Sequence, residues 1–314
     1  MAPSLDIPDV VQRRALASGA EGQAWLRGLP ARVATLERQW GLTGSGVLRG
    51  GSAALVVAAT TQEGEEVILK LTMPGLDASA SELRTLLCAK GHGYVRVLRH
   101  DAGQGALLLE RLGPRLSELG LAPAVQRELI CQTLLEAWRD VPADARFMSG
   151  AEKAESLAHF IEDMQARLAT PCPRALIDMA LRFAHARRAA FDPRHAVLAH
   201  GDCHSQNTLL VRGGGPRRFK FIDPEPLFIE RGYDLGILMR EWSAELLAGD
   251  AFALGVERCR RLSELTGVEP RSIWQWGFIE RVSTGLLLRH LALDTEADEI
   301  LDVATAWAAR PEPF

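Results

Sequence analysis

The feature that most constrains the fold is a change of pattern at residues 110–114, whose sequence is Glu-Arg-Leu-Gly-Pro. Before it, short β-favouring runs such as 55–57 and 67–69 alternate with glycine turns, which predicts a small antiparallel sheet. After it, apolar residues recur at three- and four-residue intervals, which predicts helices. The sequence therefore predicts an α+β fold in two lobes, residues 1–112 and 113–314.

The first lobe is expected to contain one helix among its strands, at about 78–89, after an N-terminal helix that stops near Gly41. Further strands are expected at 94–98 and 106–109. One hairpin, 208–211 with 219–222, interrupts the second lobe. The helices expected in the second lobe are 116–140, 151–168, 174–190, 235–248, 251–266 and 272–292.

Composition excludes several classes of protein. The chain of 314 residues has a net charge of −4, which provides no basic field for nucleic acid. Its five cysteines lack CxxC spacing, so a reducing compartment is favoured over a disulfide framework. No apolar stretch reaches the ~18 residues of a membrane span, and the start does not resemble a signal peptide. We expect a cytoplasmic protein without a membrane or nucleic-acid partner.

The run 200–207, His-Gly-Asp-Cys-His-Ser-Gln-Asn, carries the strongest chemical signal. Asp202 is followed five residues later by Asn207, and Asp223 closes the next strand. Phosphoryl transfer needs a carboxylate that orients the attacking hydroxyl and oxygen ligands for Mg²⁺. We expect Asp202 to be the catalytic carboxylate, and Asn207 and Asp223 to bind the metal.

A phosphate-binding lysine is expected in the first lobe. Lys70 lies on a strand whose alternation places Val67 and Leu69 on the opposite face. Glu82, on the following helix, is the best-placed acidic partner. A lysine held by a glutamate is a recurrent device for binding ATP phosphates, so we expect this pair to bind the nucleotide.

Two further stretches are candidates for contacts to ATP. Gly50, Gly51 and Ser52 lie between the first two strands, where backbone N–H groups could approach phosphates, although a plain hairpin turn explains them equally well. Glu110 and Leu112 lie at the junction of the lobes and are candidates for backbone contacts to adenine.

A zinc site is the alternative reading of the same loop, because His200, Asp202, Cys203 and His204 can all bind metals. These four residues are too close together in sequence to surround one ion without a second cluster. We therefore expect His200 to support the loop by hydrogen bonding.

The run 200–207 together with Ile222-Asp223-Pro224 resembles the aminoglycoside phosphotransferase family, in which glycine replaces the arginine of the protein-kinase catalytic loop, as Gly201 does here. The stretch 230–234 is most similar to the branch of streptomycin 6-kinases and aminoglycoside/hydroxyurea resistance kinases. The resemblance covers about residues 35–290. It implies a protein-kinase-like fold, the cofactors ATP and Mg²⁺, and the site roles given above.

The resemblance also implies a small-molecule hydroxyl acceptor, most readily streptomycin or a related aminoglycoside. A cationic acceptor would need carboxylates, and four glutamates near the motifs are candidates: Glu225, Glu230, Glu241 and Glu280. Asp234 is open to a structural role, paired with Arg231, or to a substrate-facing one. The alternatives are a kinase of a non-antibiotic or peptide-antibiotic hydroxyl compound, and a nucleotide-binding regulatory module without turnover.

Overall fold

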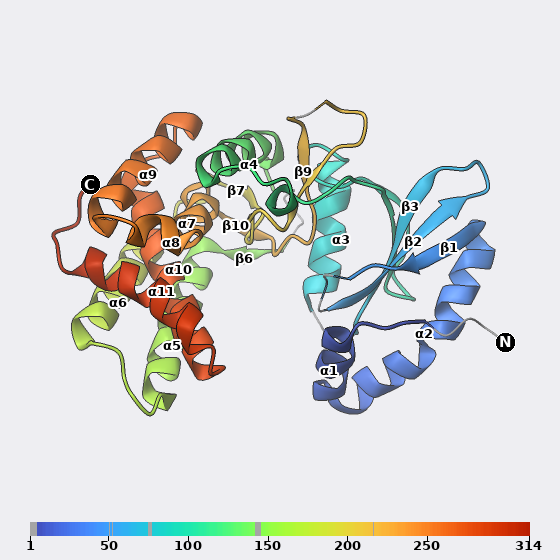
Figure 1. Ribbon diagram of the computed structural model, residues 1–314, viewed down its shortest axis with the longest axis horizontal. Helices are drawn as coiled ribbons and strands as arrows, with labels where there is room; N and C mark the ends of the chain where they lie inside the picture. Colours follow the sequence, from blue (N-terminus) through green and yellow to red (C-terminus); the bar gives the residue numbers. More distant parts are fainter. Residues whose placement is uncertain (1–4, 50, 52, 75–76, 142–145, 216) are drawn as a thin grey trace. The chain divides into compact units, whose positions relative to one another are not determined.

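The computed structural model describes residues 5–49, 51, 53–74, 77–141, 146–215 and 217–314. The chain forms two compact units (Figure 1). Unit 1 comprises residues 1–113 with 211–215, and unit 2 comprises 114–210 with 216–314. None of the helices in the described ranges combines the length and the apolar character that crossing a membrane requires.

Unit 1 contains a five-stranded sheet in the order β1-β2-β3-β5-β4, with every neighbouring pair antiparallel. Its strands are β1 (Leu42–Val47), β2 (Ala54–Thr61), β3 (Glu66–Thr72), β4 (Val97–Asp101) and β5 (Ala106–Glu110). The antiparallel sheet that the sequence predicts is therefore present. The expected strand at 94–98 begins three residues later, at Val97.

Helices flank this sheet (Figure 1). Leu69 and Leu71 of β3 belong to the core formed with α1 (Asp9–Ala17) and α2 (Gly19–Trp40). Because side chains alternate along a strand, Lys70 emerges on the other face, where it contacts α3 (Asp77–Ala89). The α2 helix ends where the sequence predicts, since Gly41 adopts a left-handed φ of 67°.

Unit 2 is mainly helical. The hairpin that the sequence predicts is present as β8 (Thr208–Leu210) and β9 (Phe219–Phe221). A three-stranded sheet, β6-β10-β7, was not expected; it consists of β6 (Met148–Ser149), β10 (Leu227–Glu230) and β7 (Ala196–Ala199). All four residues of β7 are buried, so it lacks the alternation that reveals a half-buried strand. The helices of this unit are η1 (Leu116–Glu118, a 3-10 turn), α4 (Pro123–Ala137), α5 (Gly150–Arg167), α6 (Arg174–Ala190), α7 (Gly232–Arg240), α8 (Ser243–Leu247), α9 (Ala251–Thr266), α10 (Pro270–His290) and α11 (Asp294–Ala308).

Two of the expected helices are divided in the structure. The segment 116–140 contains η1 and, after a break, α4, which starts at Pro123 because proline fits the first turn of a helix. The segment 235–248 is broken at Trp242, whose φ of 53° is left-handed and cannot continue an α-helix. This break lies at the end of α7, beside the residues described next.

Candidate active site

The loop that carries Asp202 is fixed by a buried carboxylate on α7. Asp234 is fully buried and accepts hydrogen bonds from the backbone N–H groups of His200 (3.0 Å) and Gly201 (2.8 Å). It also accepts one from Trp138 Nε1 at 2.8 Å. Three donors compensate the cost of burying this charge. The expected pair between Arg231 and Asp234 is not the one formed, because the Arg231 guanidinium lies over the Trp138 ring at 5.6 Å.

Gly201 is required by the backbone geometry at the start of the loop. Its φ is +86°, and a Cβ atom there would lie 1.8 Å from the carbonyl oxygen of Glu225. The segments are this close because the Glu225 N–H donates to the carbonyl of His200 at 2.8 Å. Only glycine fits both constraints.

His200 supports the loop, as the sequence predicts. Its Nδ1 accepts from the Asp202 N–H (3.1 Å), so Nε2 carries the proton and donates to the carbonyl of Ile222 (3.0 Å). Complete burial lowers the pKa of His200 and keeps the ring neutral. The histidine therefore joins the Asp202 loop to the segment that precedes Asp223.

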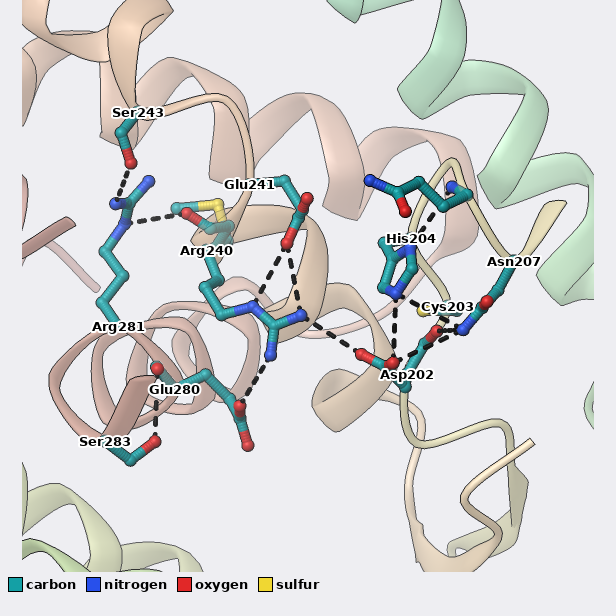
Figure 2. Close-up of polar contacts among 12 residues, drawn as sticks. Asp202, Cys203, His204, Asn207, Arg240, Glu241, Ser243, Glu280, Arg281 and Ser283 are labelled. Atoms are coloured by element: carbon teal, nitrogen blue, oxygen red, sulfur yellow. Dashed lines mark hydrogen bonds and ion pairs between the residues drawn. The ribbon is translucent and has the colours of Figure 1, made fainter. Parts of the chain in front are cut away.

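Both carboxylate oxygens of Asp202 accept hydrogen bonds (Figure 2). His204 Nε2 donates to Oδ2 at 3.1 Å and Arg240 donates to Oδ1 at 3.2 Å. Burial alone would raise the pKa of Asp202, but the hydrogen bond from His204 and the neighbouring positive charge of Arg240 hold that pKa well below its usual range. Such a weakly basic carboxylate is better suited to orienting a hydroxyl group than to removing its proton early.

Asn207 is held so that its oxygen remains available. Its Nδ2 donates to the Asp202 carbonyl (3.0 Å) and approaches Asp202 Oδ2 (3.4 Å). The network thus assigns the amide nitrogen to Asp202, and within the described chain no hydrogen bond engages the amide oxygen. A neutral oxygen of this kind is a suitable ligand for Mg²⁺.

The β8–β9 hairpin brings Asp223 to the same end as Asn207. The Ile222 N–H donates to the carbonyl of Asn207 at 2.9 Å, and Asp223 is the next residue. Asp223 has a left-handed φ of 53°, a conformation that costs about 1–3 kcal/mol for a non-glycine residue and is common at functional sites. These features fit a metal ligand, and the role stays a prediction.

A zinc cluster is not supported. Among the described residues, no three or more histidine, cysteine, aspartate or glutamate side chains gather as a metal site would require. A Mg²⁺ site needs fewer protein ligands, because Mg²⁺ is usually bound by one or two carboxylates together with substrate phosphates and water.

The Lys70–Glu82 pair is present in unit 1. Lys70 Nζ lies 2.6 Å from Glu82 Oε1, and only 8% of Lys70 and 7% of Glu82 are exposed. Lys70 is paired with Val56 and Leu107 on the neighbouring strands, so its backbone is fixed by the sheet. The binding of phosphates by this pair stays a prediction.

The other expected nucleotide contacts are less defined. Gly50 and Ser52 lie outside the described residues, whereas a Cβ atom at Gly51 would meet nothing closer than 3.8 Å, so the turn does not require glycine there. The Glu110 N–H already donates to the carbonyl of Arg96 at 3.0 Å. A contact from Glu110 to adenine would therefore use its carbonyl oxygen. Leu112 is buried, and its role stays a prediction.

Arg240 is the residue of this site that the sequence did not reveal. Its guanidinium contacts three carboxylates, those of Asp202 (3.2 Å), Glu241 (3.2 Å) and Glu280 (3.3 Å) (Figure 2). In sequence it is an ordinary basic residue in the last turn of a helix. No sequence signal marks it, because the break at Trp242, which gives the chain a special conformation nearby, is seen only in the structure.

Three of the four glutamates considered for a cationic acceptor are already engaged. Glu241 and Glu280 contact Arg240, and Glu280 also accepts from Tyr233 Oη at 2.6 Å. Glu230 accepts from Arg187 at 3.3 Å and from Trp276 Nε1 at 2.9 Å, which indicates a structural role. Within the described chain, the carboxylate of Glu225 has no hydrogen bond or ion pair.

Comparisons with known proteins show which family the chain is similar to. The model of the family described as aminoglycoside/hydroxyurea antibiotic resistance kinase matches residues 39–290. Streptomycin 6-kinase of Streptomyces glaucescens is 30% identical over 295 residues, covering 93% of this chain and 92% of that relative. Hydroxyurea phosphotransferase of Kitasatospora aureofaciens is 32% identical over 284 residues, covering 86% of this chain and 80% of that relative.

A solved structure supports the fold. An aminoglycoside phosphotransferase of Streptomyces rimosus, in complex with ADP and streptomycin, superimposes with a TM-score of 0.52 at 16% identity, covering 82% of this chain and 98% of that chain. Such low identity informs the fold alone. It confirms the protein-kinase-like fold that the catalytic-loop motif predicts.

Proposed function

Because the chain belongs to the aminoglycoside/hydroxyurea antibiotic resistance kinase family, we propose that it transfers the γ-phosphate of ATP to a hydroxyl group of streptomycin or a related aminoglycoside. The modified antibiotic would lose its binding to its target, which gives resistance or self-protection. We propose that the reaction takes place in the cytoplasm, where ATP is abundant and where the five cysteines would remain free thiols.

The observation that carries the proposal is the state of Asp202. Its carboxylate is held through both oxygens by His204 and Arg240, which also keep its pKa well below its usual range. Catalysis of phosphoryl transfer depends mainly on positioning and on charge stabilisation, so a fixed carboxylate is the part that an acceptor hydroxyl requires.

The remaining side chains have defined tasks in this proposal. Lys70, fixed by Glu82, binds the phosphates of ATP as a point charge. Asn207 and Asp223 would hold Mg²⁺, which when bound neutralises charge on the phosphates. Asp202 accepts a hydrogen bond from the acceptor hydroxyl and receives its proton late in the transfer.

Glu225 is proposed to bind the positive charge of the acceptor. Its N–H donates to the carbonyl of His200, which places its backbone beside the Asp202 loop, and within the described chain its carboxylate makes no hydrogen bond or ion pair. A guanidinium-bearing acceptor such as streptomycin would supply that partner through a charge-assisted hydrogen bond.

Hydroxyurea is a second candidate acceptor, favoured by the 32% identity to a hydroxyurea phosphotransferase. Hydroxyurea is neutral, so it would gain little from a free carboxylate. The two candidates therefore differ in their need for Glu225.

The first experiment is Mg²⁺-dependent release of ADP from ATP across a panel of hydroxyl acceptors. The panel contains streptomycin, other aminoglycosides, tuberactinomycin-type peptides, hydroxyurea and choline. Stimulation by streptomycin, with a monophosphorylated product by mass spectrometry, is the expected result. Stimulation only by choline or a peptide antibiotic would show that the proposed aminoglycoside acceptor is wrong. Tight ATP binding without turnover would indicate a regulatory module.

A further inference from the structure

We propose that Arg240 is a positioning residue for the transfer reaction: it fixes the Asp202 carboxylate so that one lone pair of Oδ1 points to the acceptor hydroxyl. This inference rests on the proposed function, because it concerns the same reaction. Arg240 acts through Asp202 and is not required to touch either substrate.

The hydrogen bonds of Asp202 divide its two oxygens into different roles. Oδ2 accepts from His204 Nε2 (3.1 Å) and is approached by Asn207 Nδ2 (3.4 Å), so both of its lone pairs are used. Oδ1 accepts only from Arg240 (3.2 Å) within the described chain. Since each carboxylate oxygen has about two acceptor positions, one position on Oδ1 remains for the acceptor hydroxyl.

Arg240 is itself held in place by a buried acid. Glu280 is 5% exposed and is bonded to Tyr233 Oη and to Arg240. If Arg240 swung away, Glu280 would keep a buried charge without its cation, which is strongly unfavourable. The guanidinium is therefore fixed between Glu280 on one side and Asp202 on the other (Figure 2).

The backbone around Arg240 is also fixed, by two buried arginines. Arg258 donates to the carbonyls of Glu241 (2.7 Å) and Trp242 (3.3 Å). Arg281 donates to the carbonyl of Met239, the residue immediately before Arg240, at 2.9 Å. Arg281 thus binds a carbonyl that the last turn of α7 leaves without a helical partner, and Arg258 binds the link between α7 and α8, where the Trp242 carbonyl also accepts from the Glu245 N–H at 3.2 Å.

This arrangement is costly if its only purpose is stability. Buried ion pairs contribute little net stability, because desolvation offsets their attraction. Here one arginine, held by Glu241 and Glu280, contacts the one carboxylate that the reaction needs. Fixing that group removes the freedom it would otherwise lose in the transition state.

The test is a double-mutant cycle of Arg240→Met and Asp202→Ala, measured with the acceptor that gives the fastest turnover. Arg240→Met should lower kcat about 100-fold, the size of effect that a misplaced catalytic group produces, with an unchanged KM for ATP. In the Asp202→Ala background, Arg240→Met should have no further effect, because the group through which it acts is gone.

Two variants keep the test valid if Arg240→Met folds poorly. Glu280→Gln combined with Arg240→Met removes the buried acid together with its cation and should show the same loss of kcat. In Arg240→Ala, added guanidinium ion should restore part of kcat at an unchanged melting temperature.

The matched control is Arg187→Met. Arg187 is also largely buried and pairs with a glutamate, Glu230, but has no contact with Asp202. It should lose stability and keep kcat per folded molecule. If the wild-type enzyme is active and the two single-mutant losses of kcat multiply in the double mutant, the positioning role of Arg240 would be wrong, while the proposed function would stand. Absence of wild-type turnover with every acceptor would overturn the proposed function as well.

Discussion

Gly201 illustrates at the scale of one residue how the loop that carries Asp202 depends on backbone geometry. Gly201→Ala would place a methyl group against the carbonyl of Glu225 and would also strain a positive φ. We expect at least a 100-fold loss of kcat/KM, because a displacement of about 1 Å in Asp202 is enough for such an effect. Steady-state kinetics of the purified variant measures it.

The matched control for this prediction is Gly213→Ala. Gly213 has a similar positive φ of 69°, but a Cβ atom there would meet nothing within 4 Å. Gly213→Ala therefore tests the effect of backbone strain without a steric clash. If Gly201→Ala and Gly213→Ala had equal activity, the proposed close approach to Glu225 would be wrong.

Glu225→Gln tests the acceptor site. Removal of the negative charge should raise KM for streptomycin about 10-fold, the typical size of one charge-assisted hydrogen bond. KM for ATP should not change, and turnover of neutral hydroxyurea should be unaffected. Glu299→Gln, at an exposed position on α11, is the control for a general effect of charge. An unaltered KM for streptomycin would exclude Glu225 from the acceptor site.

The sequence predicts the residues that belong to local motifs, and their roles stay predictions. In unit 2, Asp202, Asn207 and Asp223 have a fixed spacing around one hairpin, and in unit 1, Lys70 and Glu82 lie on adjacent elements. Arg240 could not be predicted, because it reaches Asp202 across 38 residues of sequence. A contact of this kind depends on how α7 packs beside the loop, which no local pattern encodes.

At the scale of elements, α7 and α10 pack closely through glycines. A Cβ atom at Gly236 would lie 2.7 Å from the Cβ of Trp276 and 2.9 Å from the backbone nitrogen of Gly277. Although alanine favours helices by up to ~1 kcal/mol over glycine, Gly236→Ala should destabilise the protein by about 1–3 kcal/mol, the typical cost of overpacking. Urea denaturation of the wild type and the variant measures the difference.

Gly28→Ala in α2 is the control for this pair of helices. The nearest atom to a Cβ atom there is Arg32 Nε at 3.6 Å, so the methyl group fits. Helix propensity should then dominate, and the variant should be as stable as the wild type or more stable. A Gly236→Ala protein that is stabilised as much as Gly28→Ala would contradict the close packing.

The elements that the sequence predicts well are those with a complete periodic face. Helices α5, α6 and α9 start and end within a residue or so of the expected positions, because each has one apolar stripe and clear ends. The division between α7 and α8 was missed because Trp242 is an apolar residue that fits the helical pattern, while its left-handed backbone is set by the surroundings. The strand β7 was missed because all four of its residues are buried, so its sequence shows no alternation.

At the scale of the whole molecule, the reactivity of the five cysteines depends on how deeply each thiol is buried in its unit. Cys88 of unit 1 is partly exposed, whereas Cys131, Cys172, Cys203 and Cys259 of unit 2 are buried. Burial raises the pKa of Cys131 to about 12, so at pH 8 only about one molecule in 10⁴ would carry the reactive thiolate.

We therefore expect a thiol reagent at pH 8 to modify one cysteine of the native protein quickly and the other four only upon unfolding. The four slow thiols should become reactive together as urea is raised, because unit 2 is one compact unit expected to unfold cooperatively. Mass spectrometry of the labelled peptides identifies each site, and Cys88→Ser is the control that should remove the fast phase. Rapid labelling of Cys203 without urea would show that the loop carrying Asp202 opens locally, which would contradict the closed network around Asp234 that holds this loop in place.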